Sequence, residues 1–217
     1  MELAVLGTGA AGRAIAARLA ELGHHVSIGT RDPEATLARD DFAGWAGDHP
    51  AVRPATFEAA ASGAEVVLLV TSGSASLDVL TRAGAENLEG KVVIDVSNPL
   101  DFSQGMPPTL FVKDTDSLAE QLQRAFPAAR VVKTLNTMNN EVMVHPELLP
   151  DPGSVFVSGN DAAAKETATG LLAEFGHTDV IDLGDLSTAR GAEMLLPIWV
   201  RLMGVMGTAR FNFKIVR

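Results

Sequence analysis

The feature that most constrains this chain is a glycine-rich turn that begins at residue 7. The apolar run 3–6 leads into Gly7-Thr8-Gly9-Ala10-Ala11-Gly12, and the apolar positions of the following stretch, up to Leu22, recur at helical spacing. A second apolar run occupies 25–31. A strand, a G-x-G-x-x-G turn, a helix and a second strand, in this order, are typical of the βαβ unit that binds a dinucleotide.

Each glycine of this turn has a predicted role. Gly7 allows the strand to turn sharply into the helix, Gly9 lets the backbone approach a pyrophosphate, and Gly12 allows helix and strand to pack closely. The start of the helix offers unpaired N–H groups and a partial positive charge to the phosphates. We therefore expect the whole turn to bind the cofactor: Gly7, Thr8, Gly9, Ala10, Ala11 and Gly12.

The end of the second predicted strand indicates which dinucleotide binds. NAD-binding units place Asp or Glu there to bond the ribose 2′-hydroxyl, whereas an Arg suits the 2′-phosphate of NADP. This strand ends in Gly29-Thr30-Arg31, and a hydroxyl beside a guanidinium can bind a phosphate. The residues therefore favour NADP over NAD, with Thr30 and Arg31 as ligands. Asp32 leaves an alternative open, because it could pair with Arg31 or accept a hydrogen bond from the ribose.

Composition argues against several other classes of function. The formal net charge of −10 and the isoelectric point near 4.9 argue against nucleic acid or an anionic membrane as a partner. The absence of cysteine excludes disulfides and thiolate catalysis. The longest apolar runs, such as 66–70, are strand-sized and far shorter than a membrane span. Because the first residues already read as a strand, we expect no signal peptide and a cytoplasmic protein.

Apolar, strand-like runs alternate with helical stretches along the rest of the chain. The runs are 66–70, 92–96, the start of 130–140, 154–159 and 178–182. This alternation predicts an α/β fold of the Rossmann type, with a doubly wound, mostly parallel sheet and a C-terminal helical segment. Polar loops follow three of these strands, and ligands of open α/β sheets bind at the carboxyl ends of the strands. The first two loops are therefore expected to line the cofactor groove: Thr71, Ser72, Gly73, Ser97 and Asn98.

The connecting segments carry weaker signals. Asp32 is a plausible N-cap of a short helix that starts at Pro33, and Asp161 is a plausible cap of the helix that runs to Phe175. Segment 40–54 reads as mixed loop and helix, and 100–115 reads as irregular. The histidines are scattered and mostly lie at turns or strand starts, so we expect ordinary packing or surface roles for them and no metal site. Asp95 and Lys133 each remain open between a structural and a functional role.

The character of the chain changes at residue 185. A stretch rich in Leu and Met predicts one long helix that ends near 204–207, and the tail 211–215 alternates like a strand. So apolar a helix must pack on the sheet, on a neighbouring subunit in a homodimer, or on both. We therefore divide the chain into a nucleotide-binding domain, 1–184, and a C-terminal segment, 185–217.

Several of these stretches together resemble a known family, the NADPH-dependent coenzyme F420 reductases. They also resemble the cytosolic oxidoreductase domain of the six-transmembrane metalloreductases. The resemblance extends over nearly the whole chain and is carried by 7–12, 29–31, 95–98, 132–137, 157–161 and 184–190. This combination is much more specific than the glycine motif alone.

The resemblance implies hydride exchange between NADP(H) and a flavin-like acceptor, in the first place coenzyme F420. Thr8, Thr30 and Arg31 would hold the 2′-phosphate end. The nicotinamide and the acceptor would be bordered by Asn136, Met138 and Asn139, and the deazaflavin would be covered by Met206 and Gly207. No acid–base pair is needed, because hydride transfer between two cofactors requires mainly orientation and electrostatics.

The third polar loop departs from the archaeal deazaflavin reductases, which carry His and Pro where this chain has Asn136 and Asn139. Asn136-Thr137 is closer to the metalloreductase domain. The acceptor therefore stays open between a deazaflavin, FMN, FAD and a small organic substrate. A dehydrogenase or imine reductase that acts on a small substrate would need a longer helical substrate domain than the roughly thirty residues that remain. A non-catalytic NADPH-binding sensor would need the same nucleotide site and is a third alternative.

Overall fold

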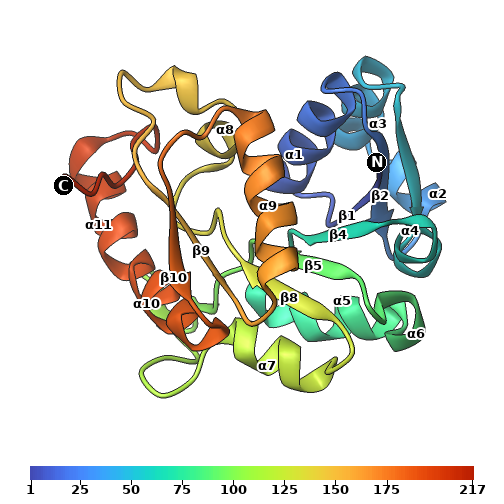
Figure 1. The fold of residues 1–217 in the computed structure, drawn as a ribbon. Helices are drawn as coiled ribbons and strands as arrows, with labels where there is room; N and C mark the ends of the chain where they lie inside the picture. Colours follow the sequence, from blue (N-terminus) through green and yellow to red (C-terminus); the bar gives the residue numbers. More distant parts are fainter.

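A computed structural model describes residues 1–217 and places eight strands in one twisted sheet (Figure 1). The sheet order is β10-β9-β8-β5-β4-β1-β2-β3. The strands span β1 (Glu2–Leu6), β2 (His25–Thr30), β3 (Val52–Thr56), β4 (Val66–Leu69), β5 (Val92–Asp95), β8 (Arg130–Lys133), β9 (Val155–Gly159) and β10 (Val180–Gly184).

The pairing of the strands confirms the predicted α/β fold of the Rossmann type. Every pair from β3 to β8 is parallel, β9 is antiparallel to β8, and β10 is parallel to β9. The strand order reverses beside β1, so the crevice between the ends of β1 and β4 is the topological switch point. Ligands of open α/β sheets bind at this point.

Helices cover both faces of the sheet (Figure 1). They span α1 (Ala10–Glu21), α2 (Pro33–Leu37), α3 (Asp40–Asp48), α4 (Phe57–Gly63), α5 (Ser76–Ala83), α6 (Ala85–Leu88), α7 (Leu118–Ala125), α8 (Asn140–Val144), α9 (Ala162–Phe175), α10 (Ala189–Met194) and α11 (Leu196–Met206). Short 3-10 turns occupy η1 (Gly73–Ala75), η2 (Pro146–Leu148) and η3 (Leu186–Thr188).

Alternating side chains of the strands build a core on each face. In β1, Leu3 and Val5 pack with α1, α3, α8 and α9, whereas Ala4 and Leu6 pack with helices α4 to α7. Successive residues of a strand point to opposite faces, so a strand covered on both sides must be apolar throughout. This explains why the central strands read as unbroken apolar runs.

The predicted helix caps are present. Asp32 accepts the N–H of Ala35 at 3.0 Å at the start of α2, where Pro33 occupies the first turn. Asp161 accepts the N–H of Ala164 at 2.7 Å at the start of α9. Such caps satisfy donors that the first helical turn leaves unpaired.

Two segments are more regular than their sequence indicates. The end of 40–54 enters strand β3, which contains Pro54 and forms the edge of the sheet. Proline is tolerated at an edge, and only Val52 of β3 is fully buried, so no alternating pattern marks this strand. The irregular segment 100–115 contains a short antiparallel hairpin of β6 (Leu100–Asp101) and β7 (Thr109–Leu110).

The C-terminal segment differs from the prediction in two ways. The expected single helix is broken at Leu195 into α10 and α11, because Pro197 lacks an N–H and starts a new helix in its first turn. The tail 211–215 forms no strand. Ser154 donates its N–H to the carbonyl of Phe213 at 2.7 Å, but the N–H of Ile215 is then taken by the Ser154 hydroxyl at 3.0 Å, so the backbone ladder does not continue.

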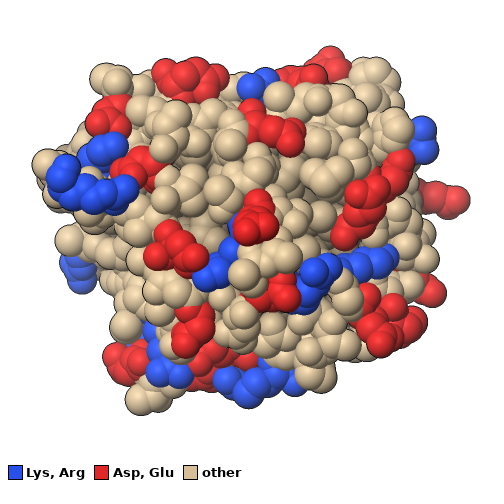
Figure 2. Space-filling view, in the orientation of Figure 1, with Lys and Arg blue, Asp and Glu red and all other residues tan.

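Surface charge and helix length bear on possible partners. No helix is long and apolar enough to cross a membrane. On the face shown in Figure 2, Lys and Arg are scattered among Asp and Glu and form no basic stripe.

Candidate functional site

The glycine-rich turn joins β1 to α1 along a path that requires glycine at two positions. Gly7 has a φ of +130°, and a Cβ there would lie 2.2 Å from the carbonyl oxygen of Val70. A Cβ on Gly12 would lie 2.0 Å from the carbonyl oxygen of Gly7. These two glycines let the turn pack tightly against α1 and the end of β4.

Gly9, by contrast, faces open space. A Cβ on Gly9 would meet no atom within 4 Å. Gly9 is the N-cap of α1, no side chain accepts the first N–H groups of the helix, and its first turn holds no acidic residue. Free N–H groups at the positive end of a helix dipole, with room in front of them, suit a pyrophosphate.

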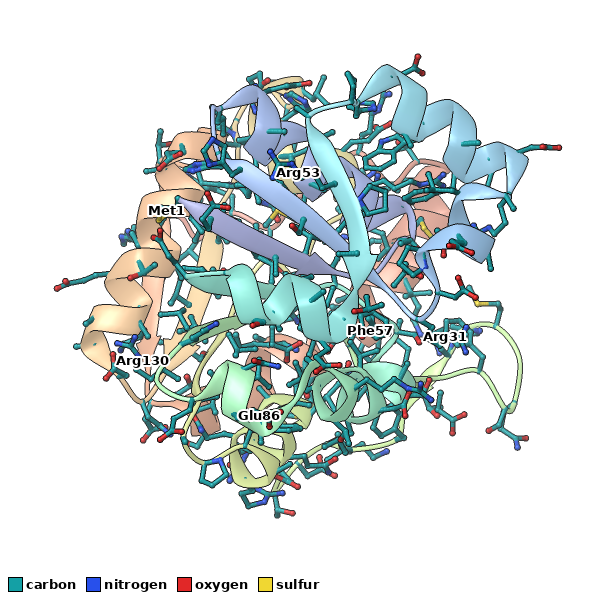
Figure 3. The ribbon with its side chains drawn as sticks, turned by 90° about the vertical axis from the view of Figure 1, so that its right-hand side faces the viewer. Met1, Arg31, Arg53, Phe57, Glu86 and Arg130 are labelled. Atoms are coloured by element: carbon teal, nitrogen blue, oxygen red, sulfur yellow. The ribbon has the colours of Figure 1, made fainter.

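A first cavity of about 510 Å³ opens beside the end of β2, between α2 and the start of α5. Five residues predicted to bind the cofactor line it: Gly7, Thr8, Thr30, Arg31 and Thr71. Figure 3 shows Arg31 near Phe57, which also lines this cavity.

Two guanidinium groups line the first cavity, Arg31 and Arg39. Arg31 is exposed, and its neighbour Asp32 uses a carboxylate oxygen to cap α2 instead of pairing with it. Arg39 lies 2.9 Å from Asp41, and the hydrogen bond and charge of that carboxylate raise the pKa of Arg39. Asp32 and Asp78 also line this cavity, but the carboxylate of Asp32 is engaged at the start of α2. The exposed guanidinium of Arg31 therefore offers a planar set of donors that suits an anionic ligand group such as a phosphate.

Thr30 is oriented differently from the sequence-based prediction. Its side chain is buried, and its Oγ1 lies 2.7 Å from the Oγ1 of Thr36. Thr36 donates to the carbonyl of Asp32 at 2.7 Å, so the shared bond between the two hydroxyls must be donated by Thr30. The Thr30 proton is thus directed toward α2 and not into the cavity that the residue lines.

A second cavity, of about 380 Å³, lies at the ends of β1, β4 and β5. The predicted residues that line it are Gly9, Ala10, Ala11, Thr71, Ser72, Gly73, Ser97 and Asn98. Thr71 lines both cavities, so together they form one groove across the switch point of the sheet. A groove of this kind suits an extended molecule with one polar, anionic end and one flat, less polar end.

The loops after β4 and β5 touch each other at Gly73. A Cβ on Gly73 would lie 2.1 Å from the carbonyl oxygen of Asn98. Nearby, the Thr71 hydroxyl hydrogen-bonds Ser76 at 3.1 Å. The predicted polar loops therefore form one continuous wall, and Gly73 is needed for their close approach.

Asn136 lies behind this wall and lines neither cavity. It is only 2% exposed, and its amide group donates to the Oδ1 of Asn98 at 3.0 Å and to the carbonyl of Ala192 at 3.1 Å. Asn98 in turn donates to the carbonyl of Asn136 at 2.9 Å. Asn136 therefore supports a groove residue and does not border the groove itself.

Four other residues assigned to the acceptor side by family resemblance also lie outside the two cavities. Met138 is buried in the core beneath α8, and Asn139 caps α8 by accepting the N–H of Val142 at 3.0 Å. Met206 and Gly207 are exposed at the C-terminal end of α11, where Gly207 adopts a left-handed conformation. The neighbouring tail is joined to α8 by an ion pair of 2.6 Å between Arg210 and Glu141.

Several residues that line the groove were not predicted from the sequence. Arg39 lies in the turn between α2 and α3, where no motif marks it. Leu100, Phe102 and Met143 add apolar surface to the second cavity. Phe102 is 56% exposed. The segment 100–115 also holds Phe111 and several aliphatic residues, so the sequence carried no signal that singled out Phe102.

A metal site receives no support from the side-chain arrangement. No three side chains among His, Asp and Glu come together in a way that could hold a metal ion. The histidines instead contact nearby carboxylates or backbone carbonyls, as His24 does with Glu174 at 2.6 Å and His177 with the carbonyl of Met143 at 2.9 Å.

Comparison with known proteins connects this groove to a family. Residues 2–99 match the family of coenzyme F420-dependent NADP oxidoreductases. The F420-dependent NADP reductase of Methanothermobacter marburgensis is 30% identical over 217 residues, which cover 93% of this chain and 92% of that protein. The crystal structure of a candidate F420-dependent NADP reductase from Arthrobacter sp. FB24 is 61% identical and superposes with a TM-score of 0.98 over the whole of both chains.

The resemblance to metalloreductases is also confirmed. Metalloreductase STEAP3 of Rattus norvegicus is 30% identical over 205 residues, which cover 91% of this chain but only 38% of that protein. The reductase from M. marburgensis, in contrast, is matched over nearly its full length. The chain belongs to the family of coenzyme F420-dependent NADP oxidoreductases.

Proposed function

We propose that this protein transfers a hydride between NADPH and coenzyme F420. In the reducing direction the hydride and a proton from solvent convert F420 to its dihydro form, and NADPH becomes NADP⁺. This chemistry belongs to the two bound cofactors. The protein supplies binding, orientation and exclusion of water.

The observation that carries the proposal is the pair of guanidiniums in the first cavity. Arg31 and Arg39 line it at the end of β2, where the adenosine ribose of a dinucleotide lies in folds of this type. Arg31 is exposed and available for a phosphate, because Asp32 caps α2. This arrangement supports the 2′-phosphate of NADP as the ligand group and disfavours the carboxylate-to-ribose contact that NAD uses.

The other parts of the groove suit the rest of NADPH. The open space at Gly9 and the uncapped start of α1 would accept the pyrophosphate. Ser72, Ser97 and Asn98 would then surround the nicotinamide end in the second cavity. Phe102 offers an exposed aromatic ring on the same cavity, and a flat heteroaromatic acceptor could stack against it.

The C-terminal segment supports a further part of the proposal, a homodimer. Ile198 and Val205 lie seven residues apart on one side of α11 and are 52% and 86% exposed. Met206 is also half exposed at the end of this helix. Apolar side chains exposed together on one helix favour burial against another protein surface. We propose that two copies pack through α11 and that Met206 and Gly207 approach the acceptor at this side.

A binding and turnover experiment tests the proposed function. Purified protein is titrated with NADPH and with NADH by fluorescence, and F420, FMN or FAD is then added to the NADPH complex in separate samples. We expect tighter binding of NADPH than of NADH and rapid bleaching of F420. Reduction of FMN or FAD instead of F420 would overturn the acceptor assignment. Tight NADPH binding without reduction of any of them would favour a small organic substrate or a non-catalytic NADPH sensor.

A further inference from the structure

Three charged side chains meet in the interior directly behind the second cavity. The Nζ of Lys133 lies 2.9 Å from the Oδ2 of Asp95 and 3.0 Å from the Oε1 of Glu193, and all three side chains are at most 2% exposed. Asp95 ends β5, Lys133 ends β8, and Glu193 lies in α10. The cluster therefore joins the centre of the sheet to the C-terminal segment.

The cluster holds Ser97, which lines the second cavity, from three sides. Asp95 accepts the Ser97 N–H at 2.9 Å and its hydroxyl at 2.5 Å. Lys133 donates to the Ser97 carbonyl. The N–H, the hydroxyl and the carbonyl of one groove residue are thus all bonded to the Asp95–Lys133 pair.

A second chain of hydrogen bonds also joins the groove to α10, beside the one that runs from Ser97 through Lys133 to Glu193. Asn98 is bonded in both directions to Asn136, and Asn136 donates to the carbonyl of Ala192, the residue before Glu193. The two consecutive groove residues, Ser97 and Asn98, are therefore linked to two consecutive residues of α10. A displacement of α10 would act on both connections at once.

Glu193 also attaches α7 to this cluster. Its carboxylate accepts the N–H groups of Leu118 at 2.9 Å and Ala119 at 3.2 Å, the first residues of α7. A carboxylate is stabilised at the positive end of a helix dipole, and here it satisfies two donors that have no partner within the helix. Glu193 is thereby held on both sides, by α7 and by Lys133.

Stability alone does not account for so many buried charges. Burial raises the pKa of Glu193, which shows that its charged form is disfavoured there despite the attraction of Lys133. Burial alone would lower the pKa of Lys133, but its attraction to Asp95 and Glu193 outweighs this effect and raises it. Well-packed apolar side chains often replace such clusters without loss of stability. What apolar side chains cannot supply is the directed bonds to Ser97.

We propose that Lys133 and Glu193 are positioning residues that hold Ser97 and Asn98 against the nicotinamide end of NADPH and tie this loop to the C-terminal segment. The role rests on the proposed use of NADPH but not on the identity of the acceptor. The adenosine half of the groove shares none of these contacts. Loss of the cluster should therefore disturb the nicotinamide end selectively.

The test uses Glu193→Gln and Lys133→Met. Glu193→Gln is nearly isosteric but removes the charge that attracts the Nζ of Lys133 from the side of α10, while Asp95 stays in place. It therefore weakens the hold on Lys133 and is the milder change if Lys133→Met does not fold. Lys165→Met is the matched control, because Lys165 also bonds a carboxylate and a backbone carbonyl, those of Asp182 and Gly184, away from the groove. Folding of each variant is verified by circular dichroism.

Three measurements separate positioning from general damage. We expect the affinity for 2′,5′-ADP, which probes the adenosine half, to change by less than about twofold, while kcat falls on the order of 10- to 100-fold through misplacement of the reacting ring. The fluorescence gain and anisotropy of the bound reduced nicotinamide should fall as the ring loosens. The control should match wild type in all three.

Two results would overturn the proposal. One is unchanged nicotinamide fluorescence in a folded Glu193→Gln or Lys133→Met variant, and the other is an equal loss of affinity for 2′,5′-ADP and NADPH. If the wild-type protein bleaches no F420, the proposed function fails, but the nicotinamide fluorescence still decides whether the cluster positions the ring. If wild type shows no nicotinamide fluorescence gain either, the positioning role fails as well.

Discussion

Asn98 and Asn136 are bonded to each other in both directions, with donor–acceptor distances of 2.9 and 3.0 Å. Asn98 lines the second cavity, whereas Asn136 lies behind it in the interior. The pair therefore connects the wall of the groove to the buried core by two hydrogen bonds. It also shows that a polar residue after a strand can serve the site without touching a ligand.

Asn136→Ala would leave the Oδ1 of Asn98 and the carbonyl of Ala192 without their partner. A buried polar group without a partner costs about 1–3 kcal/mol, and of these two only the carbonyl of Ala192 is fully buried, since Asn98 is half-buried. We therefore expect the free energy of unfolding to fall by about 1–3 kcal/mol. Urea denaturation measures it. A change within experimental error would show that these bonds contribute nothing. Asn140→Ala, at the half-buried asparagine that begins α8, is the control.

Arg31→Ala should weaken NADPH binding by about 1.5–3 kcal/mol, the range for a hydrogen bond to a charged group, and leave NADH binding nearly unchanged. Arg39→Ala should have the same sign but a smaller effect, because Arg39 is already paired with Asp41. Arg53→Ala is the control, since Arg53 is exposed on β3 and lines neither cavity (Figure 3). Titration calorimetry measures the affinities. Equal losses for NADPH and NADH would contradict the phosphate role.

Gly9→Ala and Gly12→Ala should separate ligand binding from folding. A methyl group on Gly9 enters empty space, so we expect a change in unfolding free energy within about 0.5 kcal/mol together with weaker NADPH binding. A methyl group on Gly12 would collide with the carbonyl of Gly7, so we expect destabilisation by about 1–3 kcal/mol or more. Thermal unfolding with and without NADPH distinguishes the two. Wild-type NADPH affinity in Gly9→Ala would count against a pyrophosphate at this turn.

His177 should make the fold less stable in mild acid. Burial lowers the pKa of its imidazole, although the hydrogen bond to the Met143 carbonyl partly opposes this effect. The unfolded chain binds a proton near pH 6.5 while the folded chain stays neutral, so this stabilisation is complete above about pH 6.5 and is lost as the pH falls toward the lower, folded pKa. In His177→Gln, which keeps a donor for Met143, the difference in stability from wild type should shrink from pH 7 to pH 5. A constant difference would refute titration of His177 as the cause.

The parts of the fold that repeat a simple pattern could be predicted from the sequence. The βαβ unit, the apolar central strands and the caps at Asp32 and Asp161 each depend on neighbouring residues, and the structure has all of them. Strand β3 was not predicted, because an edge strand with Pro54 and one buried side chain shows no alternation of apolar and polar residues. The prediction of a strand at 211–215 was wrong. Alternation shows only which side chains face inward, and not whether the backbone pairs with a neighbouring strand.

The candidate site was predictable where its residues follow strand ends. Thr71, Ser72, Gly73, Ser97 and Asn98 all reach the groove, as their loops indicate. The sequence could not show that Asn136 and Lys133 point into the interior. Their partners, Ala192 and Glu193, belong to α10, which is distant in the sequence and packs beside them only in the folded protein. Arg39 was hidden for a similar reason, since only the path of α2 brings it to Arg31.

The central claim is direct hydride transfer from NADPH to F420 on this protein. A stopped-flow single-turnover measurement with NADPH that carries deuterium at the transferred C4 position tests it most directly. We expect F420 to bleach with a primary isotope effect and the deuterium to appear in the reduced deazaflavin. Bleaching without deuterium transfer, or no bleaching by a protein that binds NADPH tightly, would contradict the account.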